Sequence, residues 1–206
     1  MHGWPAGRSR TGPCLAYARE MAAGTDSELS ALSAAAVAFA TPAMLCMAGS
    51  GTGADSFPVE VGFVLPDGAS HCTLIRPAPH WTHWDPQAER VHRITRAAAV
   101  SHGRDVAEVA ALLNTRLGGS TVYCDGAVSE QAWLRRLFDA ARTTPAFRVE
   151  SLRVLLSERE SAFWHVLQRQ VTTEMRLQRH RASADAKILQ LTLIRLRGPL
   201  PAPPGT

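Results

Sequence analysis

The segment PVEVGFVLPDGASHCTLIRP, residues 58–77, carries the clearest local structural signals in the chain. Its apolar residues Val59, Val61, Phe63 and Leu65 occupy alternate positions, as they do in a strand that buries one face. Asp67-Gly68 is a dipeptide that strongly favours a two-residue hairpin turn. The segment therefore predicts two antiparallel strands, 58–65 and 70–77, joined by a tight turn.

Another strand is expected just before this hairpin. The run AMLCM, residues 43–47, is apolar without interruption, which is typical of a strand covered on both faces. The Gly/Ser-rich stretch 49–56 connects it to the hairpin. Three consecutive antiparallel strands are therefore predicted.

Helices and short strands alternate in the rest of the chain, and helical crossovers between strands imply parallel pairing. The predicted order of elements is βββαβαβαα, which defines an α/β fold with a mixed five-stranded sheet flanked by helices. The predicted downstream elements are a helix at 104–118, a strand at 121–125, a helix from Ser129 to before Pro145, a strand at 147–152, a helix at 157–178 and a helix from Ala182.

The length of 206 residues and the composition, 46% hydrophobic and 19% charged, are those of an ordinary globular protein with one main domain. We place that domain at residues 41–197. Residues 1–40, rich in Ala, Gly and Arg, are expected to form a poorly ordered lead-in, and residues 198–206 a Pro-rich tail. The net charge of +4 permits a nucleic-acid partner without requiring one.

The cysteines at 14, 46, 72 and 124 form no C-x2-C pair, so no zinc site is predicted. Reduced, buried thiols favour a cytoplasmic location. The uncharged segment 29–49 is broken by Pro42 and rich in Ala and Ser, so we expect no membrane association.

The segment HRASADA, residues 180–186, pairs a group that titrates near neutral pH with a hard oxygen ligand. His180 could activate water, and Asp185 could hold a divalent metal beside it. A structural interpretation, in which the histidine caps a helix and the aspartate is solvated, fits the same spacing.

Together with PVEVG, VHRITR and the acidic residue before W-L, HRASADA resembles the DEDDh family of 3′–5′ exonucleases, which are DnaQ-like and have the ribonuclease H-like fold. The resemblance covers residues 43–196. It implies four carboxylates that hold two divalent metal ions, and a histidine that deprotonates the attacking water. Two ions are needed because charge develops on both the entering and the leaving oxygen during cleavage of a phosphodiester.

The first acidic motif of that family, D-x-E, is degenerate in this chain. Counting back from Ser56-Phe57-Pro58 places its two positions on Cys46 and Ala48. Cysteine is a soft ligand poorly suited to magnesium, and alanine is no ligand.

The other functional positions of the family are retained. The resemblance assigns the third carboxylate to Glu130, the fourth to Asp185 and the general base to His180, with Asp125 as an additional carboxylate near the metal site. This set predicts at most one Mg²⁺ or Mn²⁺.

Other residues have two interpretations each. His92 lies near the substrate nucleotide if the resemblance holds, or else begins a helix. Arg179 and Arg181 flank the expected cleft and would meet backbone phosphates. Trp81 and Trp84 either stack on bases or, as we favour, pin a proline-rich loop to the core.

The acidic residues outside the retained set were also considered as metal ligands. Asp26-Ser27-Glu28 is a D-x-E triplet that could replace the missing pair, although it lies far upstream. Glu60 could reach the site from the neighbouring strand, but a solvent- or loop-facing position is favoured. Arg135 and Arg136 are expected to be solvated.

The sequence thus predicts an exonuclease-like domain that binds the single-stranded 3′ end of a nucleic acid, with weak or lost metal-dependent hydrolysis. Two alternatives stay open. One is a pseudoenzyme that serves as a protein-interaction module, and the other is an active exonuclease whose carboxylates come from elsewhere in the chain.

Overall fold

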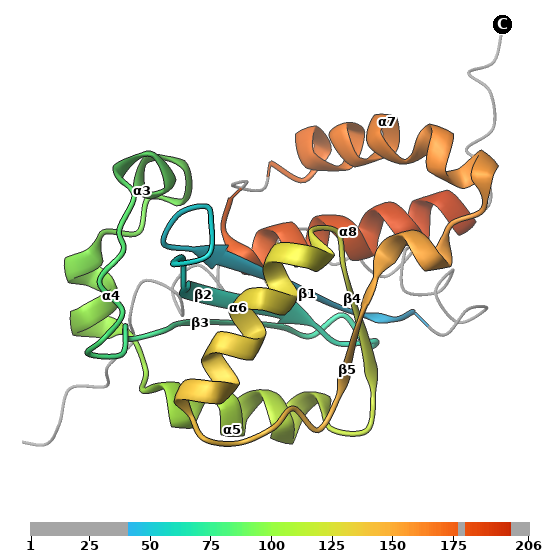
Figure 1. Ribbon diagram of the computed structural model, residues 1–206. Helices are drawn as coiled ribbons and strands as arrows, with labels where there is room; N and C mark the ends of the chain where they lie inside the picture. The colour runs from blue at the N-terminus through green and yellow to red at the C-terminus, as the bar shows by residue number, and fades with distance from the viewer. Residues whose placement is uncertain (1–40, 177–179, 199–206) are drawn as a thin grey trace, which may run out of the picture.

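The computed structural model describes residues 41–176 and 180–198. It contains a five-stranded sheet with the strand order β3-β2-β1-β4-β5 (Figure 1). The first three strands pair antiparallel, and β4 and β5 continue the sheet in parallel from β1. The predicted mixed sheet is therefore confirmed. Its strands are β1 Ala43–Gly49, β2 Pro58–Val64, β3 Ser70–Leu74, β4 Thr121–Cys124 and β5 Arg148–Ser151.

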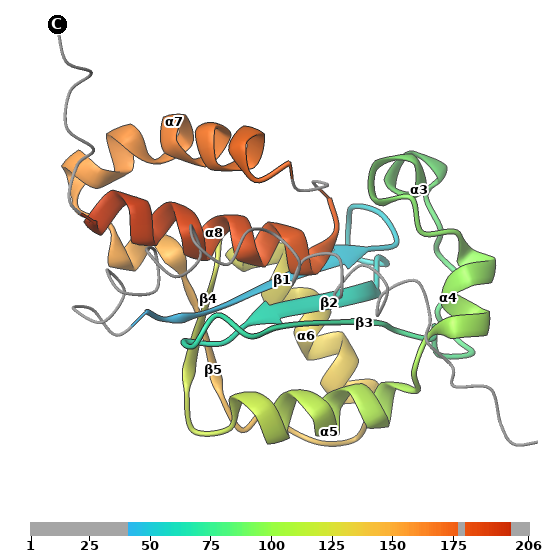
Figure 2. The same cartoon turned by 180° about the vertical axis from the view of Figure 1, so that it is seen from behind.

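Helices cover both faces of the sheet, as Figures 1 and 2 show from opposite sides. Helix α8 lies across β1 and β2 on one face, and α7 packs on α8. Helix α6, supported by α5, covers the other face. The described helices are α3 Pro86–His92, α4 Arg96–His102, α5 Val106–Leu117, α6 Ala127–Ala140, the 3-10 turn η1 Leu152–Leu155, α7 Glu158–Glu174 and α8 Ala182–Arg197.

Four helices differ from the sequence prediction. The short helices α3 and α4 were not predicted, because seven residues give too little periodicity to recognise. Their N-caps, Asp85 and Thr95, were the available signal, since each side chain accepts a backbone N–H of the first turn. Helix α6 starts before the predicted cap Ser129, and α7 ends at Glu174 instead of 178.

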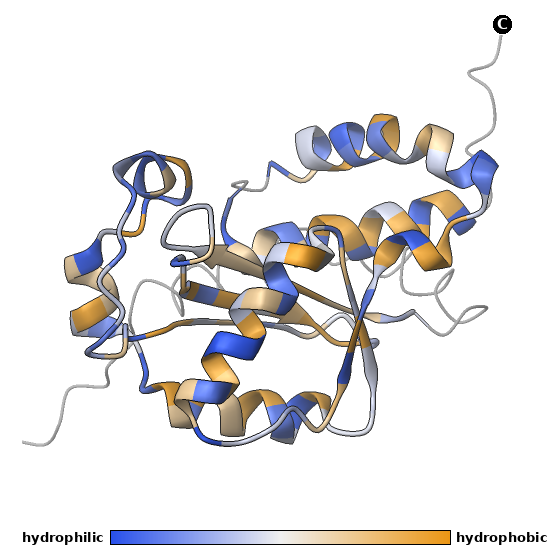
Figure 3. Cartoon of the chain, in the orientation of Figure 1, coloured by the Kyte–Doolittle hydropathy of each residue, from blue (hydrophilic) through white to orange (hydrophobic). Residues whose placement is uncertain are grey.

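Strand β1 separates two apolar layers. Leu45 and Met47 belong to the layer between the sheet and α5 and α6, whereas Met44 and Cys46 belong to the layer beneath α8. The strand is therefore buried on both faces, as its unbroken apolar run predicted. In Figure 3 the helices that cover the sheet carry both colours, as expected of helices with one buried side.

The contact between α8 and β2 requires a glycine. A Cβ atom placed on Gly62 would lie 2.1 Å from the backbone nitrogen of Ser183 and 2.4 Å from the carbonyl carbon of Ala182. Both neighbours are backbone atoms, which cannot move aside as a flexible side chain can. Gly62 thus lets the first turn of α8 rest directly on the sheet.

We expect Gly62→Ala to lower the free energy of unfolding by about 3 kcal/mol or more, because α8 has to lift off β2. Denaturant titration measures the change. Gly53→Ala is the control. Its Cβ would meet nothing within 4 Å, and its φ of +93° should cost only about 1–2 kcal/mol. Equal losses of unfolding free energy in the two variants would contradict the conclusion that the contact between α8 and β2 requires Gly62.

Candidate functional site

The direction of chain growth through the sheet reverses between β1 and β4. In the order β3-β2-β1-β4-β5, the chain first moves outward from β1 to β3 and then continues on the other side with β4 and β5. Such a switch point leaves a crevice beyond the carboxyl ends of the two central strands, where ligands bind in open α/β sheets. The residues at these ends are Cys46–Gly49 and Cys124–Asp125.

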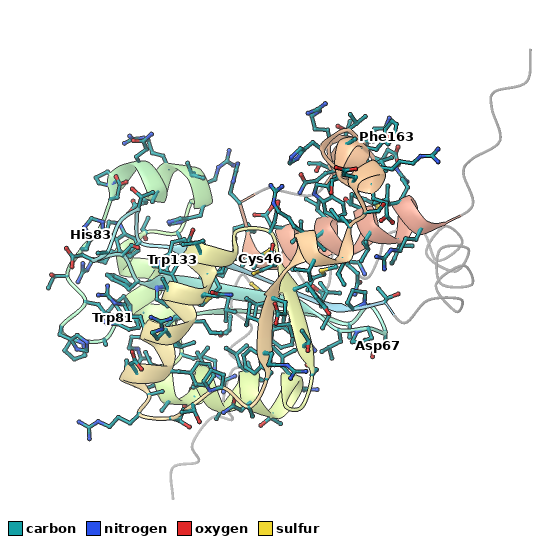
Figure 4. The ribbon with its side chains drawn as sticks, turned by 45° about the vertical axis from the view of Figure 1, so that its right-hand side comes forward. Cys46, Asp67, Trp81, His83, Trp133 and Phe163 are labelled. Carbon is teal, nitrogen blue, oxygen red and sulfur yellow. The ribbon has the colours of Figure 1, made fainter. Side chains whose placement is uncertain are left out.

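Cys46 lies in the middle of this region (Figure 4). It is 7% exposed and packs in the layer beneath α8. Burial raises the pKa of its thiol well above the usual value, and the nearby charges of Glu130 and Asp185 raise it further. The two retained carboxylates of the predicted site therefore approach Cys46 from α6 and α8, while its own side chain stays a neutral thiol.

Ala48 follows two positions later on β1. It pairs with Glu60 of β2 in the antiparallel register, and Cys46 pairs with Gly62. Cys46 packs in the layer beneath α8, whose first turn carries Asp185, whereas Ala48 lies beside a register irregularity and packs against the layer under α5 and α6.

Glu130 lies in the first turn of α6 and is 6% exposed. Its Oε1 accepts a hydrogen bond of 3.2 Å from the backbone N–H of Met47, and its Oε2 is buried without a hydrogen-bond partner among the described residues. Burial raises the pKa of this carboxyl to about 7, although contacts with Cys124, Met47 and Gly126 oppose the shift. The carboxyl is therefore about half protonated at neutral pH.

Asp185 and His180 are brought together by the turn that leads into α8. The backbone N–H of His180 donates to both carboxylate oxygens of Asp185, at 3.2 and 3.1 Å. His180 has a left-handed backbone with φ of 67°, and its residue is exposed. The five-residue spacing between His180 and Asp185 thus closes a local turn, and the exposed His180 lies at the edge of the site. Asp125, half-buried after β4, contributes negative charge near Cys46.

Glu60 is fully buried, so the prediction that it faces solvent or a loop is wrong. The Arg181 guanidinium donates two hydrogen bonds to Glu60 Oε1, from Nη2 at 2.6 Å and from Nε at 3.1 Å. The backbone N–H of Ala182 donates to Glu60 Oε2 at 2.8 Å. The thiol of Cys72 donates to Oε1 at 3.2 Å. Glu60 therefore holds the N-terminus of α8, and its oxygens are already engaged.

The same contact determines the position of Arg181, whose side chain is 19% exposed. Its guanidinium points inward to Glu60, so a phosphate contact by Arg181 stays a prediction. Arg179, the other arginine predicted to contact phosphate, lies outside the described residues.

His92 is the last residue of α3, not the first residue of a helix, and is 4% exposed. Its Nδ1 accepts a hydrogen bond of 3.0 Å from the backbone N–H of Ile94. Burial lowers the pKa of the imidazole, and the charge of Glu60 and the carbonyl of Gly49 partly oppose this. Nε2 has no well-aligned hydrogen-bond partner among the described residues, and the nearby Gly49 carbonyl places the ring beside the end of β1.

The tryptophans of the proline-rich loop pack against the protein, as we favoured from the sequence. Trp81 is 4% exposed and stacks on Phe57 with the ring centroids 5.2 Å apart. Trp84 packs against the same core, and Arg96 lies over its ring at 5.9 Å. Base stacking by Trp81 is therefore excluded in this conformation.

Sequence analysis missed a contact that fixes the loop after β1. Trp133 donates from Nε1 to Ser56 Oγ at 2.8 Å, and Arg136 donates to the Ser56 carbonyl at 2.8 Å. A Cβ on Gly49 would overlap the Trp133 indole, so this contact requires glycine at the end of β1. That glycine was the only sign of the contact in the sequence. The prediction that Arg136 is merely solvated is wrong, whereas Arg135 is exposed as expected.

The described residues do not fit a site for two metal ions. Across residues 41–176 and 180–198, no three His, Cys, Asp or Glu side chains lie close enough together to hold one ion. Cys46 is a neutral thiol, Ala48 has no ligand atom, and Glu60 is paired with Arg181. Asp185, Glu130 and Asp125 are the remaining carboxylates around the strand ends.

Comparison with protein-family models and with curated protein sequences finds no match. Solved structures do match. They include an E. coli exonuclease I–single-stranded DNA complex with zinc bound (TM-score 0.58, 17% identity, 76% of this chain and 41% of that chain). Exonuclease I from Methylocaldum szegediense gives a TM-score of 0.57 at 14% identity, over 75% of this chain and 40% of that one. E. coli exonuclease I in complex with a dA16 oligonucleotide gives a TM-score of 0.55 at 15% identity, over 75% of this chain and 40% of that chain.

The chain therefore has the ribonuclease H-like fold of these exonuclease I structures, as its motifs predicted. It spans about two fifths of the length of the exonuclease I chains that it matches. No helix in the described part of the chain is long and apolar enough to cross a membrane.

The raised pKa of Glu130 predicts how stability depends on pH. The folded protein retains a proton that the unfolded chain releases between about pH 4.5 and 7, so stability falls as pH rises through this range. We expect Glu130→Gln, which keeps the shape and the acceptor for Met47, to abolish that fall. In metal-free buffer at pH 8 the variant should be more stable than wild type by up to about 3 kcal/mol, and the two should converge below pH 4.5.

Denaturant titrations at a series of pH values measure this difference. Asp139→Asn on the exposed side of α6 is a matched control that should leave the pH dependence unchanged. Parallel curves for wild type and Glu130→Gln would show that the buried carboxyl is ionised in the folded protein at low pH.

Proposed function

We propose that this chain is an exonuclease-like nucleic-acid-binding domain whose metal-dependent phosphodiester hydrolysis is weak or lost. The proposed partner is a single-stranded 3′ end, received at the carboxyl ends of β1 and β4. The fold supports this proposal because its neighbours include exonuclease I bound to single-stranded oligonucleotides. A cytoplasmic location stays a prediction from the use of cysteine.

The observation that carries the proposal is the chemistry at Cys46 and Ala48. Two-metal cleavage requires anionic oxygen ligands between the ions, because Mg²⁺ prefers hard oxygen donors in near-octahedral geometry. A buried neutral thiol and a methyl group supply neither charge nor oxygen. Glu60, directly opposite Ala48, cannot compensate while both of its oxygens bind Arg181 and the N-terminus of α8.

If an ion binds here, Asp185 and Glu130, with Asp125, are the residues that would hold it, and they would supply oxygen ligands for one Mg²⁺ or Mn²⁺ at most. Glu130 has to lose its proton before it can bind an ion, since its pKa lies near 7 in the ion-free protein. His180 is the residue placed to accept a proton from water at the rim of the site. An enzyme without two of the metal-binding carboxylates should be slower by a few powers of ten, since about 1.4 kcal/mol in the barrier is tenfold in rate.

A second candidate function is supported by the exposed side of α7. Phe163 is 55% and Val166 44% exposed, one turn apart on the side away from α8, and Phe163 points outward in Figure 4. Exposed apolar residues at this spacing are compatible with a protein-interaction module. An active exonuclease that uses Asp26 and Glu28 is the other alternative, but those residues lie outside the described part of the chain.

Restoring the two lost carboxylates tests the proposal directly. We expect the wild-type protein to release no nucleotides from a 5′-labelled single-stranded oligonucleotide with Mg²⁺ or Mn²⁺, even at equimolar protein. Cys46→Asp/Ala48→Glu should gain metal-dependent 3′–5′ digestion by a factor of about a hundred or more. Denaturing gel electrophoresis of the products measures both.

The added variant Asp185→Ala in the restored protein is the control and should abolish the gain. Robust digestion by the wild-type protein that disappears in its own Asp185→Ala variant would overturn the proposed loss of catalysis. The same result would favour the active-exonuclease alternative.

Binding as a function of salt separates the proposal from an interaction module. A nucleic-acid site should bind a fluorescent single-stranded oligonucleotide saturably, with log K falling linearly in log[KCl] by about 0.7 for each phosphate contacted. We expect such a slope for wild type and for Phe163→Ser alike, since α7's outer face is not part of the site. Absence of saturable binding in 50 mM KCl would leave the interaction module as the better hypothesis.

A further inference from the structure

Arginines occupy the left-handed backbone region at three helix ends. Arg93, Arg142 and Arg176 follow α3, α6 and α7 with φ values of 59°, 53° and 49°. Glycine is the usual residue in this conformation, because a Cβ crowds the neighbouring carbonyl. A non-glycine residue held there at a steric cost is a reason to look for a function in its side chain.

A positive charge after the last turn of a helix is also favourable by itself, because the helix C-terminus carries partial negative charge. That explanation applies to each of these arginines equally. The positions of Arg93 and Arg142 relative to the candidate site distinguish these two residues.

Arg93 lies next to the site. It directly follows His92, whose ring is affected by the charges of Glu60 and Arg181 and by the carbonyl of Gly49 at the end of β1. Figures 1 and 2 show α3 standing beyond the end of the sheet at which β1 terminates. The Arg93 residue is exposed, so its guanidinium is accessible to a ligand.

Arg142 lies at the opposite end of α6 from Glu130. Twelve residues separate the two, and helix geometry puts them roughly 18 Å apart. Arg142 is exposed and left-handed like Arg93, but it belongs to the end of α6 that packs near α5 (Figure 1).

The local charge around Arg93 favours an anionic ligand. The segment from Glu89 to Arg96 contains three arginines and one acid. Glu89 is half-buried and accepts the Trp84 indole N–H, and Arg96 donates to the carbonyls of Trp81 and Thr82. Arg90, one turn before Arg93, is exposed.

We propose that Arg93, together with Arg90, contacts the phosphate backbone of the nucleic-acid strand just upstream of the nucleotide held at the end of β1. This inference rests on the proposed function. A guanidinium fork binds phosphate oxygens well, and a contact of this kind positions the strand without reading its bases. The steric cost of the left-handed arginine is then retained because glycine has no side chain to make the contact.

The proposal predicts opposite effects of one substitution on stability and on binding. Arg93→Gly removes the steric cost, so the midpoint of thermal unfolding should rise or stay unchanged. Its affinity for a 5′-fluorescein oligothymidylate with phosphorothioate linkages, in Mg²⁺ buffer, should fall about fivefold at 0.1 M KCl, and the slope of log K against log[KCl] should shrink by about 0.7. Arg93→Asn, which also tolerates the left-handed backbone, should reproduce the loss.

Arg142→Gly is the matched control. It makes the same change at a left-handed helix end away from the site, and should keep both the affinity and the salt slope of wild type. Fluorescence anisotropy at several KCl concentrations measures all four proteins.

The outcomes separate the two levels of the argument. If wild type binds but Arg93→Gly retains its affinity and salt slope, or if Arg142→Gly loses as much as Arg93→Gly, the phosphate contact is wrong while the proposed function stands. If wild type does not bind the oligonucleotide saturably, the proposed function fails and the contact with it.

Discussion

The arrangement of the site depends on the buried contact between Glu60 and the start of α8. A carboxylate on β2, between β3 and β1, is fully buried, and it is compensated by the Arg181 guanidinium and by the backbone N–H of Ala182. Removing one partner of such a pair typically costs about 3–5 kcal/mol, because the other charge stays buried without compensation. The contact, together with the close approach at Gly62, fixes where α8 meets the sheet and thereby where Asp185 lies relative to Cys46.

This anchoring has an electrostatic consequence for the site. Burial takes the first turn of α6 out of water and leaves Glu130 with a carboxyl that ionises only near neutral pH. Arg181, the residue before α8, supplies positive charge beside Glu60 of β2. Cys46 and Ala48 add no negative charge at the end of β1, so the carboxylates near this end come from α6, α8 and the residue after β4.

The sequence predicted the sheet well, because its signals are local. Alternation in 58–65, the Asp67-Gly68 turn signal and the unbroken run 43–47 all lie within segments shorter than ten residues, and the structure has strands and a hairpin at these places. Two details differ from the prediction: β2 is buried on both faces, and the hairpin loop between Leu65 and Ala69 has three residues, Pro66-Asp67-Gly68, instead of two. The amide of Gly68 donates to the carbonyl of Leu65, and Gly68 takes the positive φ expected of it. The short helices α3 and α4 escaped prediction because each makes only two turns, so capping and not periodicity defines them.

The sequence by itself determined the order of the elements along the chain, the closeness of His180 and Asp185 along the chain, and the absence of carboxylates at positions 46 and 48. Only the tertiary structure decided that Glu60 is buried and paired with Arg181, that Arg136 holds the loop at Ser56, and that the pKa of Glu130 is raised. These properties depend on groups that lie far away in the sequence: 121 residues separate Glu60 from Arg181, and 83 separate Met47 from Glu130. Burial and charge are fixed by such neighbours, and no local pattern of residues encodes them.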